Sequence, residues 1–484
     1  MKKVLLIALI MAVSIAGLTG AIFFLFFKNR GQAEEPENKV DPAMFSAMTE
    51  RKEFQDIPKM VTANGSFSKP EDYGGNDWVI RVSGSTTEEY MNYLELLENS
   101  GFTKFCDNGD DAMEGYVYSS TFTKDELTYT LSHVIRQNLT YLVAGLKEKP
   151  SPHLNYQESY MDGVREDAKT ELHMVQLYHI NGNSFIIKLR NGHFIIEDGG
   201  NTEDAPYLLD YLESLTPAGE KPFIEGWFIS HAHNDHVGCL TAMSEDQSFI
   251  DRIYLDGVYF VEPATATSEY LHMDSMWGYV TARLAPLFHD ANGAPARSYR
   301  MHLGQRYYFC DITIDVPLTL EQLPLAAYYD TDFNDTSTWL MHHIEGQKFL
   351  HGGDSHHAGM RTVMEMYDPS YFEMDVYAVF HHGINVWDYF TDYALTKVKT
   401  LLYPGFRTAS IWNPDTDPIL GARERNQHLQ ELAEEYVSFG DGTVVLTFPY
   451  KVGTYEVRPA FDWRYNGGSQ DYKEDSSAKP KEGE

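Results

Sequence analysis

The sequence predicts an α/β fold preceded by a smaller α+β unit, and three observations support this prediction. The chain has 484 residues, which exceeds the usual size of one domain. From about residue 171 onward, short apolar runs typical of strands alternate with segments of helical periodicity. The titratable residues that could bind a ligand follow directly after strands, where loops gather on a rigid sheet. We therefore expect a principal domain over residues 171–460 and a small α+β domain over residues 52–165.

The composition fits a folded, acidic protein. Hydrophobic residues make up 43% of the chain and aromatic residues 14%, which is enough for well-packed cores. The formal net charge of −33 disfavours nucleic acid as a partner, because phosphate backbones attract basic surfaces. It does not exclude a nuclease, since bound metals can supply a local positive field. The three cysteines, Cys106, Cys239 and Cys310, do not make a disulfide framework.

The first part of the chain predicts a membrane anchor. Residues 4–27 carry no charge, and a helix of this length, at about 1.5 Å per residue, would span roughly 36 Å and cross a bilayer. We expect a single-pass protein of the cell membrane with its bulk outside the cytoplasm; the alternative is a signal peptide whose cleavage gives a secreted protein. Residues 28–51 have the composition of a flexible linker, and residues 466–484 that of a disordered tail.

The small domain has the pattern of a helix packed on an antiparallel sheet. Thr86 and Glu89 form a capping-box pattern at the start of the expected helix, and Gly101 is a plausible stop. Apolar residues at helical spacing follow the cap: Tyr90, Tyr93, Leu94 and Leu97. Strands are expected at 78–82, 116–123, 126–136 and 139–146. The domain shows no catalytic constellation, and residues 147–167 are expected to link it to the principal domain.

In the principal domain, strands and helices are expected in alternation. The strands are expected at 173–179, 184–189, 194–198, 223–229, 252–258, 307–314, 339–344, 348–352, 377–380, 443–448 and 453–458. The helices are expected at 204–215, directly after the loop of residues 230–238, and at 268–289, 357–367 and 422–436. Gly192 and the pair Glu345-Gly346 mark hairpin turns.

The loop after the apolar run Phe223–Ile229 carries the strongest functional signal. In Ser230-His-Ala-His-Asn-Asp-His-Val-Gly238, three histidines and one aspartate fall within six residues. Imidazole nitrogen and carboxylate oxygen suit a borderline cation such as Zn²⁺. Burying four such groups without a partner would be costly. We therefore predict a metal site at this loop, hereafter the His loop, in preference to a solvated polar loop.

The order His231-x-His233-x-Asp235-His236 resembles the signature of the metallo-β-lactamase superfamily. Three further motifs occur in the order of that family: Phe194-Ile-Ile-Glu-Asp198-Gly-Gly, Phe349-Leu-His-Gly-Gly-Asp354 and Val376-Tyr-Ala-Val-Phe-His381-His382-Gly383. The His-His-Gly form, preceded by residues 332–339, is most similar to the branch that contains competence-protein nuclease-like domains and phosphorylcholine esterases. The resemblance covers roughly residues 172–460 and implies a metallo-β-lactamase αββα sandwich.

The resemblance also implies a centre with two divalent metal ions. His231 and His233 would hold the first ion. Asp235, His236 and His381 would hold the second, and Asp354 would bridge the two. Zn²⁺ is the first expectation, with Mn and Fe as alternatives, because His and carboxylate ligands suit all three.

Two assignments within this scheme have alternatives, the role of Asp198 and the choice between His381 and His382. Asp198 would organise the His loop through hydrogen bonds; the alternative is a simple Asp-Gly-Gly turn. His381 is preferred as the ligand because it follows the strand, and His382 would then lie behind it or face the substrate.

A further histidine that many family members place between the His loop and the bridging aspartate cannot be located. His302, His342 and His343 lie in that interval without the expected setting. His356 and His357 could contact a phosphate or donate a proton, although a surface role is the preferred interpretation.

The expected function is that of a binuclear metal-dependent hydrolase. It would cleave phosphoester or phosphodiester bonds with a metal-bound hydroxide, with Asp235, His381 and His382 as catalytic residues. The substrate would be a small molecule or a component of the cell envelope, and no protein partner can be read from the sequence. The alternatives are an ester or lactone hydrolase of the same fold, or a non-catalytic metal-binding or sensor protein.

Overall fold

The computed structural model describes most of the two expected domains. The described residues are 52, 54–72, 77–108, 112–177, 182–261, 284–323, 333–384, 386–404, 420–438 and 442–458. The expected anchor, the linker over 28–51, the tail over 466–484 and residues 268–283 of one expected helix lie outside them. Within the described ranges, no helix is both long enough and apolar enough to cross a bilayer.

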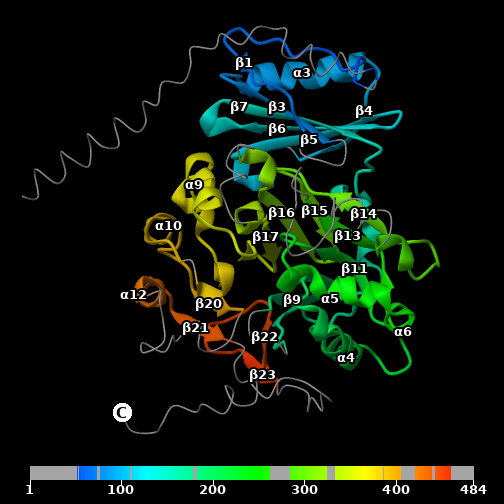
Figure 1. Cartoon of the computed structure of the whole chain (residues 1–484), viewed down its shortest axis with the longest axis vertical. Helices are drawn as coiled ribbons and strands as arrows, with labels where there is room; N and C mark the ends of the chain where they lie inside the picture. Colours follow the sequence, from blue (N-terminus) through cyan, green and yellow to red (C-terminus); the bar gives the residue numbers. More distant parts are fainter. Residues whose placement is uncertain are drawn as a thin grey trace, which may run out of the picture.

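The principal domain contains two β-sheets that face each other (Figure 1). The strands of the first sheet are β8 (Glu171–Met174), β9 (Ser184–Lys188), β10 (Phe194–Asp198), β11 (Phe223–Phe228), β12 (Tyr254–Leu255), β13 (Gly257–Phe260), β14 (Arg297–Arg300), β22 (Thr443–Thr447) and β23 (Glu456–Arg458). Their order is β14-β13-β11-β10-β9-β8-β22-β23, with β12 beside β11. Strands β10, β11, β13 and β14 run parallel to one another.

The second sheet is built in the same mixed manner. Its strands are β15 (Arg306–Phe309), β16 (Ile312–Leu318), β17 (Trp339–Ile344), β18 (Gln347–His351), β19 (Val376–Ala378), β20 (Thr400–Tyr403) and β21 (Glu435–Ser438). They follow one another in sequence order, and β18 to β21 are parallel. The expected hairpin at Glu345-Gly346 is confirmed, since both residues have positive φ between β17 and β18.

Helices cover the outer faces of both sheets. Helices α4 (Ala205–Leu215), α5 (Asn234–Glu245) and α6 (Gln247–Ile250) lie on the side of the first sheet, and α9 (His357–Met366), α10 (Asp388–Ala394) and α12 (Leu420–Leu432) on the side of the second (Figure 1). Alternation along β10 separates the two cores: Phe194 and Ile196 pack with α4 and α5, whereas Ile195 packs between the sheets. The chain thus forms the αββα sandwich that the resemblance implied.

The small domain has the expected helix on an antiparallel sheet. Helix α3 (Thr87–Asn99) begins at the predicted capping box, where the Glu89 amide donates to Thr86 Oγ1 and the Thr86 amide donates to a Glu89 carboxylate oxygen. The strands are β1 (Ser66–Phe67), β2 (Glu71–Asp72), β3 (Asp77–Ser83), β4 (Thr103–Asp107), β5 (Val117–Lys124), β6 (Leu127–Val134) and β7 (Leu139–Leu146). One face of this sheet packs on α3 through its own core.

The other face of the small sheet packs on the principal domain. Val79, Val117 and Val143 share one hydrophobic core with residues between the two large sheets. Ser132 Oγ donates to the Leu303 carbonyl at 2.6 Å across this boundary. The two units are therefore joined by a continuous apolar core as well as by the chain between them.

Several expected elements differ in the structure, among them the strands expected at 252–258 and 377–380, which are β12 with β13 and the shorter β19. The strand expected over 307–314 is a hairpin, because Cys310 adopts a positive φ of 40° and turns the chain between β15 and β16. The helix expected over 422–436 ends at Leu432, because residues from Glu435 onward pair in parallel with β20. Neither turn contains the glycine or proline that usually marks a break in a sequence pattern.

A buried ion-pair triad connects the small domain to the principal domain. His302 Nε2 lies 2.9 Å from Glu148 Oε1, and His302 Nδ1 lies 2.7 Å from Glu321 Oε1. All three side chains are buried. Burial alone would lower the pKa of His302, but the carboxylates of Glu321 and Glu148 raise it well above its usual value.

We predict that His302→Gln lowers the free energy of unfolding by about 3 kcal/mol, because it leaves two buried carboxylates without a cation. Folding raises the pKa of His302. The stability that His302 gives to the folded state is therefore complete below about pH 6.5 and is lost as the pH rises through the pKa of the folded state. The difference from the wild type, measured by denaturant unfolding, should therefore be largest near pH 6 and shrink at alkaline pH.

The control for this prediction is His343→Gln, which removes a half-buried histidine paired with Asp315 at 3.0 Å. This variant should cost less than about 1 kcal/mol. A difference for His302→Gln that is equally small, or independent of pH, would contradict the prediction.

Candidate metal centre

Four loops meet at one edge of the sandwich. Asp198 ends β10, the His loop follows β11, Asp354 follows β18, and His381-His382 follow β19. These strands run parallel within their sheets, so their carboxyl ends lie on the same side. The candidate residues from distant parts of the sequence are thereby brought together.

The His loop leads from β11 into helix α5. His233 is the N-cap of α5, and its carbonyl accepts the Val237 amide at 3.0 Å. Asp235 and His236 lie in the first turn of the helix. Gly238 is needed because a Cβ there would lie 2.8 Å from the Thr202 amide nitrogen. The helix therefore packs tightly and fixes where the loop side chains point.

Asp198 fixes the His loop through hydrogen bonds. Its Oδ1 accepts the Ser230 amide at 2.8 Å, and its Oδ2 accepts the Ser230 hydroxyl at 2.9 Å. His236 Nδ1 lies 2.7 Å from Asp198 Oδ2. Asp198 has a positive φ of 55°, which turns its side chain out of the strand pattern toward the loop. These contacts are the organising hydrogen bonds that the sequence resemblance implied.

Asp354 is placed by a tight approach between the two sheets. Gly353 has a φ of 51°, and a Cβ there would lie 2.3 Å from Ser230 Oγ. The glycine before Asp354 therefore allows a close backbone approach at this point. The Asp354 amide donates to Ser337 Oγ at 3.2 Å, and Asp354 Oδ1 lies 3.1 Å from His236 Nε2.

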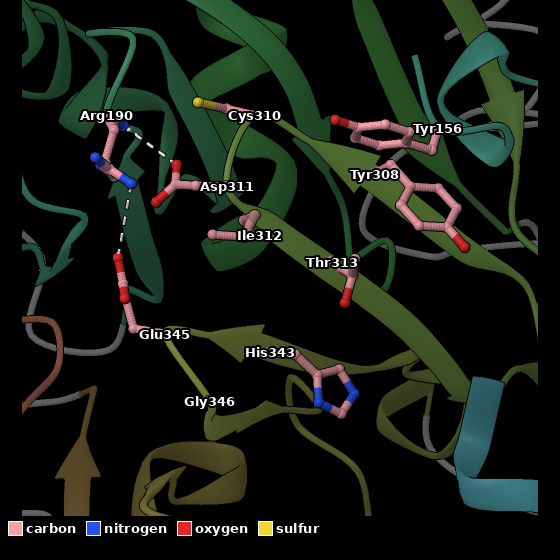
Figure 2. A pocket seen from close by; sticks show the side chains of 10 residues that line it. All are labelled: Tyr156, Arg190, Tyr308, Cys310, Asp311, Ile312, Thr313, His343, Glu345 and Gly346. Carbon is pink, nitrogen blue, oxygen red and sulfur yellow. Dashed lines mark hydrogen bonds and ion pairs between the residues drawn. The ribbon is translucent and has the colours of Figure 1, made fainter. Parts of the chain in front are cut away.

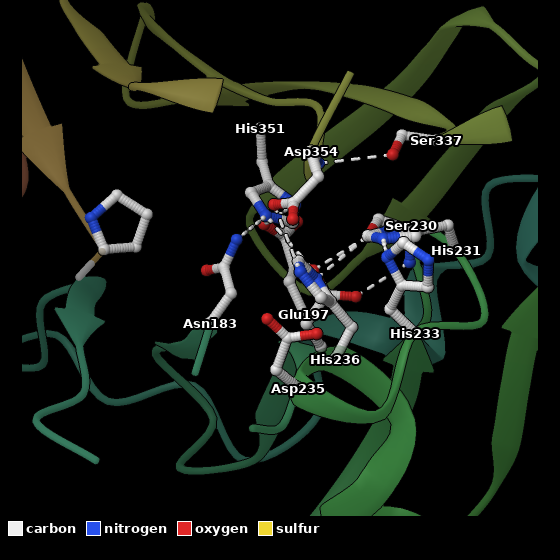
Figure 3. A network of polar contacts seen from close by, with 12 residues as sticks. Asn183, Glu197, Ser230, His231, His233, Asp235, His236, Ser337, His351 and Asp354 are labelled. Atoms are coloured by element: carbon white, nitrogen blue, oxygen red, sulfur yellow. Dashed lines mark hydrogen bonds and ion pairs between the residues drawn. The ribbon is translucent and has the colours of Figure 1, made fainter. Parts of the chain in front are cut away.

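The ligand atoms form two groups that share one carboxylate (Figure 3). The first group contains His231, His233 and Asp354, and the second contains Asp235, His236, Asp354 and His382. Within each group the ligand atoms all lie within 4.8 Å of one another. In the part of the chain that the structure describes, His236 Nε2, Asp354 Oδ1 and His382 Nε2 are buried and make no hydrogen bond. These residues therefore fit the binding of divalent metal, and Asp354 belongs to both groups.

In each of three histidines, Nδ1 contacts another residue of the protein and Nε2 faces the ligand groups. His231 Nδ1 lies 3.0 Å from Ser230 Oγ, His236 Nδ1 contacts Asp198, and His382 Nδ1 contacts the Pro404 carbonyl. When Nδ1 donates its proton in this way, the lone pair is on Nε2. This arrangement is typical of metal-ligating histidines. The role of Ser230 was not foreseen, although the sequence places this hydroxyl directly before the first histidine.

The structure reverses the sequence-based preference between His381 and His382. After β19 the chain turns through residues 380–383, where both histidines have positive φ. His382 Nε2 lies 3.5 Å from Asp235 Oδ2 and 3.6 Å from Asp354 Oδ1. His381 stands outside both groups: its Nδ1 contacts His356 Nε2 at 2.6 Å, and its Nε2 lies 3.6 Å from Asp354 Oδ2. The preference for His381 was based on its place directly after the strand, whereas β19 ends at Ala378 and the chain turns before both histidines.

The histidines that the sequence left unplaced lie elsewhere. His302 belongs to the interdomain triad, His342 contacts Glu197, and His343 contacts Asp315. His357 packs against Trp387 with ring centres 5.0 Å apart. None of them belongs to the groups found among the described residues. The first group thus keeps the reduced ligand set that the sequence suggested.

Burial and mutual attraction set the charges in the centre. Burial holds the pKa of His231 well below its usual value. Burial would also lower the pKa of His236 and of His382, but nearby carboxylates, Asp354 above all, raise them, for His382 to about 10. Burial would raise the pKa of Asp354, but these two histidines hold it well below its usual value. Without a bound cation, the carboxylates of the second group therefore favour protonation of His236 and His382; a divalent cation would take the place of these protons.

A hollow lies where the β15–β16 and β17–β18 turns meet, at the end of β18 opposite Asp354, and Figure 2 shows the side chains that line it. It has a volume of about 470 Å³ and is lined by the turns at Cys310-Asp311 and Glu345-Gly346. The Arg190 amide donates to Asp311 Oδ1 at 3.3 Å, and the Arg190 guanidinium lies 4.0 Å from Glu345 Oε1. The whole length of β18 lies between this end of the sandwich and Asp354. We therefore place the candidate reaction at the two ligand groups.

We predict that His382→Ala removes one of two bound metal ions, because His382 is the histidine that completes the second group. His381→Ala is the matched control, since it removes the neighbouring histidine that stands outside both groups. Elemental analysis of chains purified without chelator checks both. Loss of a metal in His381→Ala with full occupancy in His382→Ala would contradict the geometry.

Comparisons with known proteins give only distant matches. No family model matches the chain, and no curated protein sequence matches it. A metallo-beta-lactamase of Cronobacter sakazakii with a HARLDQ motif is 17% identical, with a TM-score of 0.22; the match covers 36% of this chain and 58% of that one. The metallo-beta-lactamase fold protein YhfI from Bacillus subtilis is 11% identical, with a TM-score of 0.33, over 56% of this chain and 95% of that one.

The assignment of the fold rests on the molecule itself. The two facing sheets, the helices outside them and the parallel strand ends that carry the ligands are all observed directly. The four ligand motifs occur in the order that the sequence resemblance implied. On these grounds the chain has the αββα architecture and the ligand motifs of a metallo-β-lactamase-like fold.

Proposed function

We propose that this chain is a metal-dependent hydrolase with two divalent cations, Zn²⁺ first among them, and that it cleaves phosphoester or phosphodiester bonds. The observation that carries the proposal is that Asp354 belongs to both ligand groups. Two cations held in this way would lower the pKa of a shared water and offset charge on substrate oxygens. The choice of a phosphoester is supported by the resemblance of the His-His-Gly motif.

The protein residues divide the work of the site among them. His231, His233 and Asp354 would hold one cation, and Asp235, His236, Asp354 and His382 the other. Asp198 and Ser230 keep His231 and His236 in the orientation that this requires. Because these groups are held by buried hydrogen bonds before any substrate arrives, little reorganisation is needed for binding.

The pair His356 and His381 lies beside the ligand groups and is suited to contact the substrate. His381 is about one-fifth exposed, at 19% of its side chain, and Asp354 is its neighbour. Burial lowers the pKa of His381 to about 4, so the ring is neutral at pH 7. A neutral imidazole can donate one hydrogen bond to a substrate oxygen without bringing a positive charge.

We predict that Asp354→Ala loses both metals. Its rate of hydrolysis of a chromogenic phosphodiester should fall by more than roughly 100-fold, which is the usual upper limit for loss of a residue that only supports a ligand. The physical reason is that one carboxylate serves both groups. Asp315→Ala is the control, because Asp315 is equally buried but lies in β16 away from the ligands. Retained metal and activity in Asp354→Ala would contradict the two-cation proposal.

Two alternatives give different outcomes in the same assay. An ester or lactone hydrolase of this fold would bind metal but turn over carboxyl esters in place of phosphodiesters. A binding or sensor protein would bind metal and turn over neither. The substrate of a phosphoesterase would be a small molecule or a cell-envelope component, since the charge of −33 disfavours nucleic acid.

For localisation, we propose an extracytoplasmic protein anchored in the cell membrane through residues 4–27, whose uncharged stretch supports an anchor. A chain that lacks residues 1–50 should then remain soluble without detergent after cell lysis, whereas the full chain should sediment with membranes. Recovery of the full chain in the soluble fraction at its complete mass would contradict the anchor.

A further inference from the structure

A charged residue lies where the fold places apolar side chains. Glu197 is the fourth residue of β10, and alternation directs it to the space between the two sheets, on the same side as Ile195. Its side chain is fully buried. A single charge in such an interior costs several kcal/mol unless partners compensate it. The sequence shows this exception as one acidic residue inside an apolar strand.

The partners of Glu197 come from the opposite sheet. His342 in β17 contacts Glu197 Oε1 through its Nε2, and His351 in β18 lies 3.2 Å from Glu197 Oε2 through its Nδ1. Both histidines are fully or almost fully buried. The His342 ring also stacks on Phe349, with ring centres 5.0 Å apart. The glutamate thus contacts both histidines of the opposite sheet at the edge that carries the metal centre.

The second nitrogen of His351 connects this cluster to Asp198. His351 Nε2 lies 3.5 Å from Asp198 Oδ2 and 3.4 Å from Asn183 Nδ2 (Figure 3). Asp198 Oδ2 is the same atom that contacts the Ser230 hydroxyl and His236 Nδ1. A continuous path of buried contacts therefore runs from Glu197 through His351 and Asp198 to two histidines of the ligand groups.

Stability alone is a weak reason for such a cluster. Replacing a buried ion pair by apolar residues of similar volume is often neutral or stabilising. What distinguishes this cluster is its contact with Asp198, whose two oxygens must face Ser230 and His236 at once. A third partner on Asp198 Oδ2, His351, restricts rotation of that carboxylate.

We propose that Glu197 and His351 are positioning residues of the metal centre. Glu197 holds the His351 ring, and His351 holds the Asp198 carboxylate in the one orientation that directs His231 and His236 to the ligand groups. The inference rests on the metal binding in the proposed function and adds two residues that act on the ligands through Asp198. It concerns how tightly the centre binds metal and does not depend on which bond the enzyme cleaves.

The test is Glu197→Gln, which keeps the volume of the side chain and removes its charge. We expect Zn²⁺ affinity, measured by competition with a chromogenic chelator, to fall roughly 10- to 100-fold, the usual effect of losing an outer-shell partner. The visible absorption spectrum of the Co²⁺-loaded chain should change as well, because the orientation of His236 would relax. A purely structural role would leave that spectrum unchanged.

The matched control is Asp315→Asn. Asp315 is as deeply buried as Glu197 and pairs with Arg306 at 2.6 Å and with His343 at 3.0 Å. It lies in β16, and none of these partners belongs to a ligand group. This variant should lose stability but keep the wild-type Zn²⁺ affinity and Co²⁺ spectrum.

His351→Gln is the second variant, and it decides the matter if Glu197→Gln does not fold. It should show a similar loss of affinity, and the double variant should lose little more than either single one, because both residues act through Asp198. Wild-type affinity in a folded Glu197→Gln or His351→Gln chain, or equal losses in Asp315→Asn, would overturn the inference. A wild-type chain without affinity for Zn²⁺ or Co²⁺ would overturn the proposed function too.

Discussion

The buried carboxylate of Asp354 is the group on which the rest of the site depends. It is almost inaccessible to solvent and lies at the seam between the two sheets. A charge in that position is tolerated only with compensating partners, and His236 and His382 supply them at 3.1 Å and 3.6 Å. The sandwich brings these residues together because each follows a parallel strand that ends at the same edge.

The supports behind the ligands form successive layers. Ser230 and Asp198 fix the rings of His231 and His236, and Asp198 is in turn contacted by His351. Gly353 follows a strand of the second sheet and allows its backbone to approach Ser230, which follows a strand of the first sheet. The supporting residues of the two sheets are therefore in direct contact. The small domain contacts the principal domain through an apolar core and the His302 triad.

Local signals made most of the fold and the ligand set predictable. Three such signals are the capping box at Thr86, the hairpin at Glu345-Gly346 and the spacing within the His loop. Each of them involves only residues that are a few positions apart in the sequence. Motifs of this kind are visible in a single sequence because the interacting atoms are close along the chain. The place of Asp354 in both ligand groups required the resemblance to a family, since the His loop lies more than a hundred residues before it.

What the sequence did not reveal depends on backbone turns and on contacts between sheets. His382 replaces His381 in the ligand group because two successive positive φ angles break the strand alternation. Cys310 turns the chain without the glycine that would have marked it. The partners of Glu197 lie on strands of the other sheet, so an acidic residue in an apolar strand was visible but its purpose was not.

The most direct test of the account is an anomalous difference map from a crystal of the chain purified with Zn²⁺, recorded at the zinc absorption edge. We predict two peaks on either side of Asp354, one beside His231 and His233 and one beside Asp235, His236 and His382. The absence of any peak at Asp354, or a single zinc bound at a different part of the molecule, would contradict the two-metal centre.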